Sequence, residues 1–262
     1  MKKIPTILVP FDFSRSAKSA LEYAVEYVGN DKNLKIVLAY ISEDHNRDMF
    51  KEAFKNTGEK YQSSLKHKLE WVAMSGALTE SLVRYQEDES IEMIIMGTFG
   101  STLGIEDDEP SNTSKLVLEV DCPVLVVPYG LEKFRMKNIA LVLGKEEIED
   151  TQVLGTLLKV ARKFNAKVHV ITIKNRPESY GYSEIDEKNE NAIQYYLENF
   201  YSEHVFIENP DVVEGIKTYA SEKEIDLITI LPRNHATSSE PSKGALTESL
   251  TLHSEVPVLA ID

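Results

Sequence analysis

Residues 91–100 read IEMIIMGTFG, and residues 122–128 read CPVLVVP. The first segment is an isoleucine-rich apolar run that leads into two glycines, and the second is another apolar run after a helix-favouring stretch. A strand, a glycine turn, a helix and a second strand make one βαβ unit. Anions bind where such turns meet the N-terminus of a helix. The two segments therefore predict a parallel α/β sheet with a potential phosphate site at one loop.

An internal repeat organises the whole chain. Four strand-like segments of the first half recur in the second half, at a spacing of 132 or 134 residues. The pairs are 6–9 with 138–141, 35–38 with 167–170, 91–95 with 225–229, and 122–125 with 256–259. A spacing this long indicates duplicated domains rather than a solenoid. We expect one domain at residues 1–130 and a second at residues 137–262, joined by a short link.

Strand-like and helix-like segments alternate within each half. The strands are short continuous apolar runs, as in a parallel sheet that is covered on both faces. Ser14 or Ser16 is suited to cap a first helix, whose apolar residues fall at three- and four-residue spacings. Further helices are expected at 46–66, 77–87, 183–201 and 211–222. Each half is therefore predicted to be a doubly wound, Rossmann-like α/β domain with a five-stranded parallel sheet.

Charge and composition exclude several classes of function. The formal net charge of −14 argues against non-specific binding to nucleic acid or to an anionic membrane surface. The chain starts without a charged-then-apolar leader, and no apolar run reaches the ~18 residues of a membrane span. We therefore expect a cytoplasmic protein. Cys122 is the single cysteine and is expected to be a buried apolar residue.

The histidines show no spacing typical of a zinc site, and no nucleophile elbow, Walker lysine loop or kinase signature occurs. No metal site is expected from local spacing, and no catalytic residue is assigned.

Three segments resemble the universal stress protein family: VPFDFS at 9–14, MGTFG at 96–100 and CPVLVVP at 122–128. The resemblance covers both halves, so the chain looks like a tandem two-domain member. It implies the strand order 3-2-1-4-5 in each domain. It also implies that the closing strands of the two halves pair across a pseudo-two-fold axis within one chain, and it leaves a homodimer of two chains open.

ATP-binding members of this family carry two glycines three residues apart, nine further residues, then a third glycine and a serine or threonine. Gly97, Gly100 and Ser111 match this pattern, whereas Pro110 stands at the third glycine. The resemblance implies that the two glycines let backbone amides approach phosphates, and that Ser111 donates to a phosphate oxygen.

The resemblance implies further contacts at the crevice between the first and fourth strands. Asp12 is expected to accept hydrogen bonds from ribose hydroxyls or to hold Mg²⁺, and the backbone of Ala39 and Tyr40 to border the adenine. The implied cofactor is ATP with Mg²⁺.

Two departures weaken this nucleotide site. Pro110 has no backbone N–H, and it stiffens the loop. Residues 106–109 read EDDE, and each carboxylate facing a phosphate would cost on the order of 1 kcal/mol unless a divalent cation bridges them. The other interpretation is that this acidic run is a solvated loop, and that residues 111–113 only cap the next helix.

The second half departs further. The alignment places Gly144 at the position of Asp12, Leu231 at that of Gly97 and Asn234 at that of Gly100. The segment LPRNH at 231–235 resembles C-terminal copies that have lost the nucleotide loop. Its Arg233 and His235 offer an anion grip, but a solvated loop is the favoured interpretation. At most one weak adenine-nucleotide site is expected, in the first half.

Two functions follow from these patterns. The first is a stress-response regulatory protein whose nucleotide occupancy alters the binding of a protein partner. The alternative is a non-nucleotide scaffold that associates through the closing strands at 122–127 and 256–261. No base or arginine clamp is evident beside Gly97, so catalysis is not expected, although a weak ATPase activity remains an open alternative.

Overall fold

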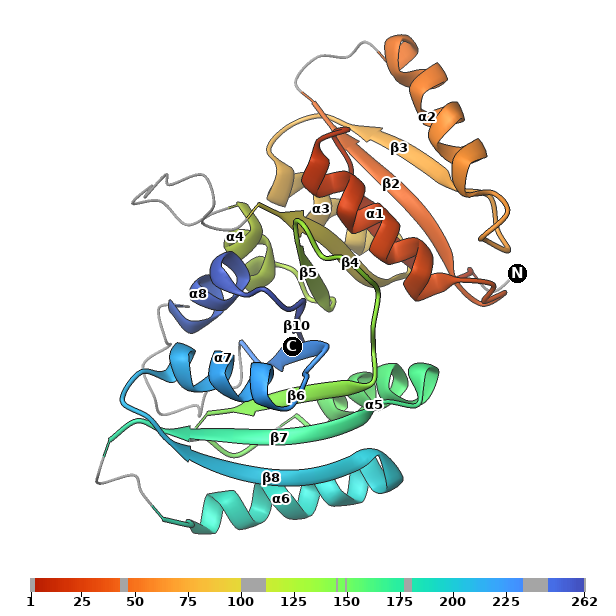
Figure 1. The fold of residues 1–262 in the computed structure, drawn as a ribbon. Coiled ribbons are helices and arrows are strands. Elements are labelled where there is room, and N and C mark those ends of the chain that lie inside the picture. The colour runs from red at the N-terminus through yellow and green to blue at the C-terminus, as the bar shows by residue number, and fades with distance from the viewer. Residues whose placement is uncertain are drawn as a thin grey trace. The chain divides into compact units, whose positions relative to one another are not determined.

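The computed structural model describes residues 3–42, 47–99, 112–144, 146–148, 150–176, 181–232 and 245–261. The chain divides into two compact units, Met1–Phe134 and Arg135–Asp262, which we call unit 1 and unit 2. Each unit is built around a parallel sheet with helices on both faces (Figure 1).

Unit 1 alternates strands and helices along the chain. Its elements are β1 (Thr6–Pro10), α1 (Arg15–Val28), β2 (Lys35–Ile41), α2 (Arg47–Tyr61), β3 (Glu70–Met74), α3 (Leu78–Asp88), β4 (Ile91–Thr98), α4 (Asn112–Glu119) and β5 (Val124–Pro128). The sheet order is β3-β2-β1-β4-β5, and every described pairing in it is parallel.

Unit 2 repeats this plan. Its elements are β6 (Asn138–Leu143), α5 (Gln152–Phe164), β7 (Lys167–Lys174), α6 (Glu184–Leu197), the 3₁₀ turn η3 (Glu198–Phe200), β8 (Tyr201–Glu208), α7 (Val212–Glu222), β9 (Leu227–Ile230), α8 (Ala245–His253) and β10 (Val258–Ala260). The sheet order is β8-β7-β6-β9-β10, again with parallel pairing. Both units therefore confirm the doubly wound fold and its 3-2-1-4-5 strand order.

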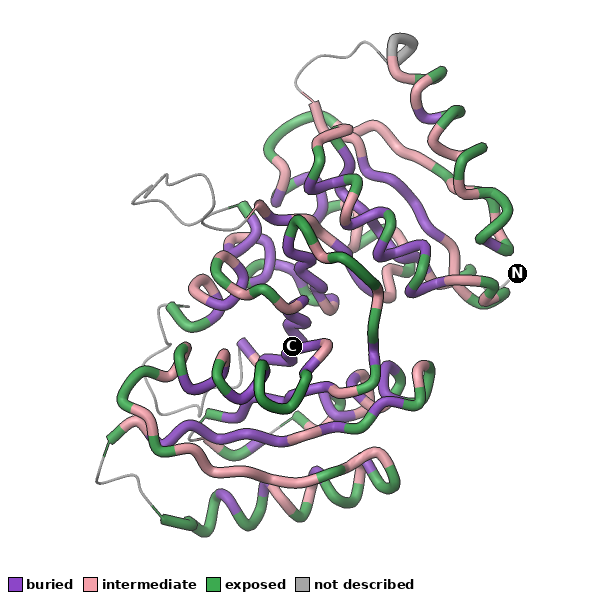
Figure 2. The backbone as a smooth tube through the Cα atoms, in the orientation of Figure 1, coloured by how far each residue is buried: buried purple, intermediate pink, exposed green. Residues whose placement is uncertain are grey.

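Burial follows the predicted pattern. Every residue of β1 and β5 is buried, because helices cover both faces of the sheet (Figure 2). Helix α1 buries an apolar stripe that includes Ala17, Leu21 and Ala24 against the sheet. Its N-cap is Ser14, whose Oγ accepts a hydrogen bond from the backbone N of Ala17 at 3.2 Å. None of the described helices is long and apolar enough to cross a membrane.

Gly97 does not lie where the sequence predicted it. We expected it in a turn after the fourth strand, but β4 continues through it to Thr98, and Gly97 pairs with Val127 of β5. A Cβ atom on Gly97 would collide with the backbone oxygen of Ser16. The missing side chain thus lets the first turn of α1 pack directly on β4.

Unit 2 has Leu231 at the position aligned with Gly97, and its first helix begins later than that of unit 1. The buried residues of α5 repeat those of α1 at a spacing of 133 residues, and at this spacing Val153, the first buried residue of α5, matches Ala20 of α1. Helix α1 begins five residues before Ala20, whereas α5 begins one residue before Val153. The first turn of α1 therefore has no helical counterpart in α5.

Candidate functional site

A cavity of about 180 Å³ opens at the carboxyl ends of β1 and β4 in unit 1. Asp12, Ala39 and Gly97, three of the predicted site residues, line it together. Apolar side chains such as Ile41, Leu78 and Met96 make up much of the remaining wall. The crevice beyond the carboxyl ends of the strands is where doubly wound sheets bind ligands.

Asp12 is fixed by its own turn. Its Oδ1 accepts a hydrogen bond from the backbone N of Ser14 at 2.9 Å, and the residue is exposed. Among the described residues no hydrogen bond reaches its other carboxylate oxygen, so that oxygen is available to a ligand. The turn ends at the N-cap of α1, where the helix dipole favours negative charge.

Two serines at the start of α1 add hydroxyl groups to the cavity. Ser14 and Ser16 both line it, and their Oγ atoms lie 3.2 Å apart. Asn112, the first residue of α4, lines it as well. From the sequence, Ser14 and Ser16 were expected only as helix caps. Their hydroxyl groups lie within one turn of Asp12 in the sequence, which is the signal that points to them.

Of the two residues predicted to border the adenine, Ala39 lines the cavity and Tyr40 does not. Ala39 lines the cavity, and its carbonyl already accepts a hydrogen bond from the backbone N of Phe11 at 2.8 Å. Tyr40 is not among the lining residues, because neighbouring residues of a strand face opposite sides of the sheet. Its ring lies 4.5 Å from that of Phe50 in α2.

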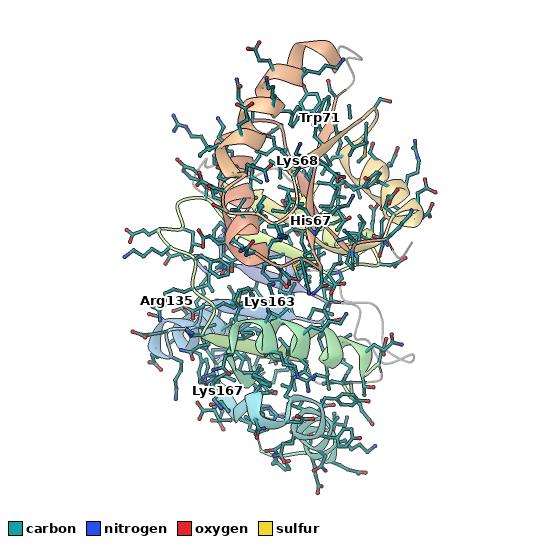
Figure 3. The ribbon with its side chains drawn as sticks, turned by 90° about the vertical axis from the view of Figure 1, so that its right-hand side faces the viewer. His67, Lys68, Trp71, Arg135, Lys163 and Lys167 are labelled. Atoms are coloured by element: carbon teal, nitrogen blue, oxygen red, sulfur yellow. The ribbon has the colours of Figure 1, made fainter. Side chains whose placement is uncertain are left out.

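An aromatic cluster stands beside the cavity, formed by Phe13, Tyr40, Phe50, Phe54 and Trp71. Trp71 of β3 lies beneath α2 (Figure 3), with its ring stacked on that of Phe54 at 4.5 Å and 3°. Phe13 adopts φ +64°, unusual for a bulky residue, and its ring lies 4.8 Å from that of Phe54. Sequence reasoning missed this cluster, although the four-residue spacing of Phe50 and Phe54 is a detectable signal.

Of the residues predicted for the phosphate end, Gly97 is described, and the others lie outside the described residues. This applies to Gly100 and Ser111, and also to Pro110 and the acidic run at 106–109. In unit 2 it applies to residues 233–235. The structure therefore brings together the residues predicted for the base and ribose end, apart from Tyr40.

Unit 2 has a different arrangement at the matching place. Gly144 stands where unit 1 has Asp12, and the chain between β6 and α5 is tied to α6 by the buried Asn189. The Asn189 side chain accepts from the backbone N of Ile148 at 2.8 Å and donates to the carbonyl of Glu146 at 3.0 Å. Ile148 is buried beneath this tie. Unit 2 thus has no aspartate at the position aligned with Asp12, although Oε2 of Glu146 lies 3.0 Å from where a Cβ atom on Gly144 would stand, and its loop is hydrogen-bonded to α6.

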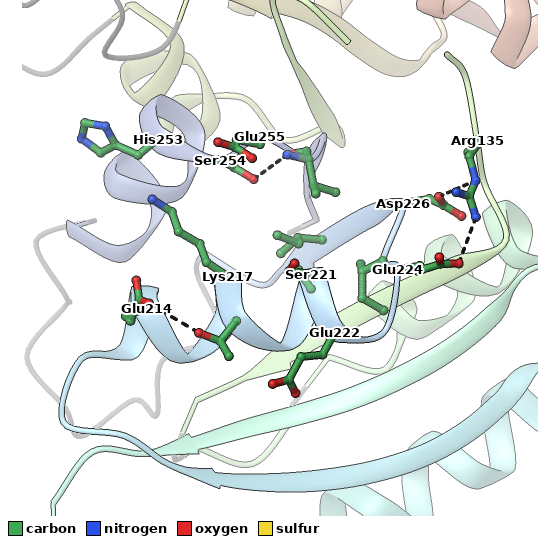
Figure 4. Close-up of a pocket in the computed structure, with 15 residues that line it drawn as sticks. Arg135, Glu214, Lys217, Ser221, Glu222, Glu224, Asp226, His253, Ser254 and Glu255 are labelled. Atoms are coloured by element: carbon green, nitrogen blue, oxygen red, sulfur yellow. Dashed lines mark hydrogen bonds and ion pairs between the residues drawn. The ribbon is translucent and has the colours of Figure 1, made fainter. Parts of the chain in front are cut away.

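A larger cavity of about 790 Å³ in unit 2 lies elsewhere in the fold (Figure 4). Its lining includes Asp226 and Val256, which stand before β9 and β10, so it opens at the amino ends of the strands. Arg135 is occupied there by ion pairs to Asp226 at 3.2 Å and Glu224 at 3.7 Å. The smaller cavity beside Asp12 is the better candidate because it lies at the carboxyl ends. Within the described part of the chain, no group of three or more His, Cys, Asp or Glu side chains could hold a metal ion.

Comparisons with known proteins agree with this architecture. A model of the Universal stress protein family matches the chain twice, at residues 3–128 and 136–262. The sequence matches no curated protein. Among solved structures, a universal stress protein from Archaeoglobus fulgidus DSM 4304 shares 17% identity with a TM-score of 0.71, over 100% of this chain and 99% of its own.

Two further structures are similar at lower scores. A protein of unknown function from Pseudomonas aeruginosa PAO1 shares 16% identity with a TM-score of 0.60, over 98% of this chain and 92% of its own. The cytoplasmic domain of a prokaryotic cation chloride cotransporter shares 12% identity with a TM-score of 0.57, over 98% and 94%. At these identities the likeness concerns the fold alone.

Proposed function

Because the chain belongs to the universal stress protein family, we propose that unit 1 binds an adenine nucleotide and that occupancy of this site regulates association with a protein partner. One observation carries the proposal. The predicted ribose ligand Asp12 and the predicted glycine Gly97, far apart in sequence, line one cavity at the carboxyl ends of β1 and β4.

The described cavity suits one end of such a ligand. Its volume of about 180 Å³ is below the ~300–1,000 Å³ of pockets that enclose drug-sized molecules. We assign it to the base and ribose of ATP bound with Mg²⁺, and we propose that Gly100 and Ser111 contact the phosphates. The carboxylate of Asp12 would accept the ribose hydroxyls. Pro110 and the acidic run at 106–109 make this a weak site.

Binding rather than catalysis fits the lining. No lysine, arginine or histidine lines the cavity among the described residues. Phosphoryl transfer depends on cationic groups that stabilise charge on the transferred phosphoryl. We therefore propose a regulatory site and not an ATPase.

The first experiment is isothermal titration with ATP and Mg²⁺, using the native chain and Asp12→Asn. The amide oxygen of asparagine can still accept from Ser14 N, so the turn is kept while the charge is lost. We expect affinity at least about tenfold weaker, because hydrogen bonds to charged groups contribute about 1.5–3 kcal/mol. The melting temperature should hardly change, since Asp12 is exposed.

Asp31→Asn is the matched control. Asp31 makes the same kind of turn, in which its Oδ1 accepts from the backbone N of Asn33 at 2.9 Å, but it does not line the cavity. Its affinity for ATP should equal that of the native chain. Equal binding by Asp12→Asn would remove Asp12 from the site.

A Pro110→Gly variant separates the two functions. If only this variant binds ATP, the cleft persists but has lost its ligand, and the non-nucleotide scaffold becomes the better interpretation. If neither chain binds, the nucleotide proposal is wrong.

A further inference from the structure

The second helix of each unit, α2 in unit 1 and α6 in unit 2, is held by different contacts: aromatic rings in unit 1 and an ion pair in unit 2. In unit 1, α2 contributes Phe50 and Phe54 to the aromatic cluster, where their rings pack on Tyr40 and Trp71. In unit 2, α6 takes this place in the chain order. Leu38 pairs with Trp71 in unit 1, and Val170, 132 residues after Leu38, pairs with His204. His204 therefore stands where unit 1 has Trp71.

An ion pair holds the start of α6 on β7. Nζ of Lys174 lies 2.8 Å from Oδ2 of Asp186, and the two side chains are only 8% and 7% exposed. The same Oδ2 accepts from the backbone N of Ser183 at 2.8 Å and from its Oγ at 2.7 Å, which closes a capping box. We call Lys174, Asp186, Ser183, Thr172 and His204 the ionic cluster.

Only one of the two ring nitrogens of His204 has a hydrogen-bond partner among the described residues. Its Nε2 lies 3.0 Å from Oγ1 of Thr172, and its ring lies 4.3 Å from that of Phe206. Its Nδ1 is buried and has no hydrogen-bond partner among the described residues. A neutral ring can donate from Nε2 and leave a lone pair on Nδ1. A protonated ring would bury a second N–H without an acceptor, which is strongly unfavourable.

Charges on both neighbouring elements act on His204. Burial is the main cause that lowers its pKa, and the ammonium group of Lys174 on β7 lowers it further. On α6, the carboxylates of Asp186 and Glu190 act in the opposite direction. Both are already engaged, Asp186 in the ionic cluster and Glu190 with the hydroxyls of Tyr182 at 2.7 Å and Tyr201 at 3.2 Å. The net effect is a lowered pKa for His204, so the neutral ring is favoured while α6 is docked.

We propose that the ionic cluster is a pH-sensitive latch, in which protonation of His204 releases α6 from β7 and β8 while α2 stays docked. The inference goes beyond nucleotide binding and does not depend on it. Once released, the ring regains an ordinary pKa of about 6.5. Because the docked ring binds its proton less readily, opening increases as the pH falls below that value, by up to about tenfold for each pH unit.

Hydrogen exchange on the full chain tests the latch. Protection factors, corrected for intrinsic exchange, should fall in α6 between about pH 7 and about pH 5.5, and should stay constant in α2. In His204→Gln the fall in α6 should vanish. His253→Gln, a change at an exposed histidine of the same unit, should leave the fall intact. Asp186 does not interfere, because its pKa is held below the usual carboxyl range.

A second variant and a second measurement guard against a variant that fails to fold. His204→Phe provides an aromatic ring, as Trp71 does in unit 1, and should dock α6 independently of pH. In the native chain, NMR titration of the His204 ring should give a pKa below the ordinary histidine value. Constant protection of α6, an equal fall in α2, a fall that persists in His204→Gln, or an ordinary His204 pKa would each overturn the latch.

Discussion

At the scale of single residues, Gly97 serves packing in addition to any role in the nucleotide site. Its backbone approaches the carbonyl of Ser16, so even a methyl group would force β4 and α1 apart. We predict that Gly97→Ala destabilises unit 1 by about 1–3 kcal/mol, as overpacking does. The measurement is urea unfolding followed by the fluorescence of Trp71, the single tryptophan and a reporter of unit 1.

Gly58→Ala provides the control within the same unit. Gly58 lies in α2, and a Cβ atom there would meet nothing within 4 Å. Alanine should stabilise the helix there by about 0.5–1 kcal/mol. A Gly97→Ala midpoint at or above the native value would show that the close approach to Ser16 is absent in solution.

Cys122 gives a second residue-scale prediction. Burial is the main cause that raises the pKa of its thiol to about 12. The thiolate is the reactive form, so at about pH 8 the folded protein should not react with Ellman's reagent. In denaturant one thiol per chain should react, because the chain has one cysteine. Rapid reaction of the folded protein would contradict the buried placement of Cys122.

Some residue roles could be predicted from the sequence. The motifs predicted that Asp12 and Gly97 lie at one crevice, and spacing narrowed the N-cap of the first helix to Ser14 or Ser16. The close approach of Gly97 to the backbone of Ser16 could not be predicted, because the two residues come together only when α1 packs on β4. The left-handed backbone of Phe13 was also hidden, since bulky residues rarely adopt it and no sequence rule signals it.

At the scale of elements, α6 depends on one buried ion pair. Lys174→Met keeps most of the side-chain volume but leaves the carboxylate of Asp186 without its cation. We predict a loss of about 3 kcal/mol in the stability of unit 2, as for other broken buried pairs. Lys188→Met on α6 is the control, because Lys188 pairs with Glu147 at an exposed position, and it should change stability little.

The ion pair also sets a pH range. Desolvation raises the pKa of Asp186, but the hydrogen bonds from Lys174 and Ser183 outweigh it and hold the pKa below the usual value. The contribution is thus present above about pH 4 and is lost as the pH falls through the depressed pKa. Urea midpoints above about pH 5 should therefore separate the two lysine variants. Equal losses for Lys174→Met and Lys188→Met would contradict the burial of the pair.

The order of elements was predictable because apolar runs and helical spacings alternate along both halves. The ends of the elements were less predictable. The strand β4 extends past Met96 because its two last residues pair with β5, but Gly97 in the sequence indicated a turn there. The late start of α5 was not evident, since residues 145–151 read KEEIEDT and suit a helix as well as a loop.

At the scale of the whole molecule, the repeat was visible in the sequence because the core strands of both halves keep their apolar pattern. The two copies differ outside that core. Unit 1 keeps Asp12 and the close-packed Gly97, whereas unit 2 has Gly144 and Leu231 at the aligned positions and ties its loop to α6 through Asn189. The duplicated fold thus carries a candidate ligand site in one copy and an ionic cluster in the other.

This asymmetry predicts one nucleotide per chain. Calorimetry with ATP and Mg²⁺ should give a stoichiometry near one, because unit 2 has Gly144 and Leu231 at the positions aligned with Asp12 and Gly97. At a free concentration ~100 times the Kd, ATP should stabilise unit 1 by about 2.7 kcal/mol, seen in the Trp71 transition. Protection from hydrogen exchange should appear around Asp12 and Gly97 and not around Gly144 and Leu231. A stoichiometry of two, or protection at Gly144, would mean that unit 2 has kept a site which its residues do not indicate.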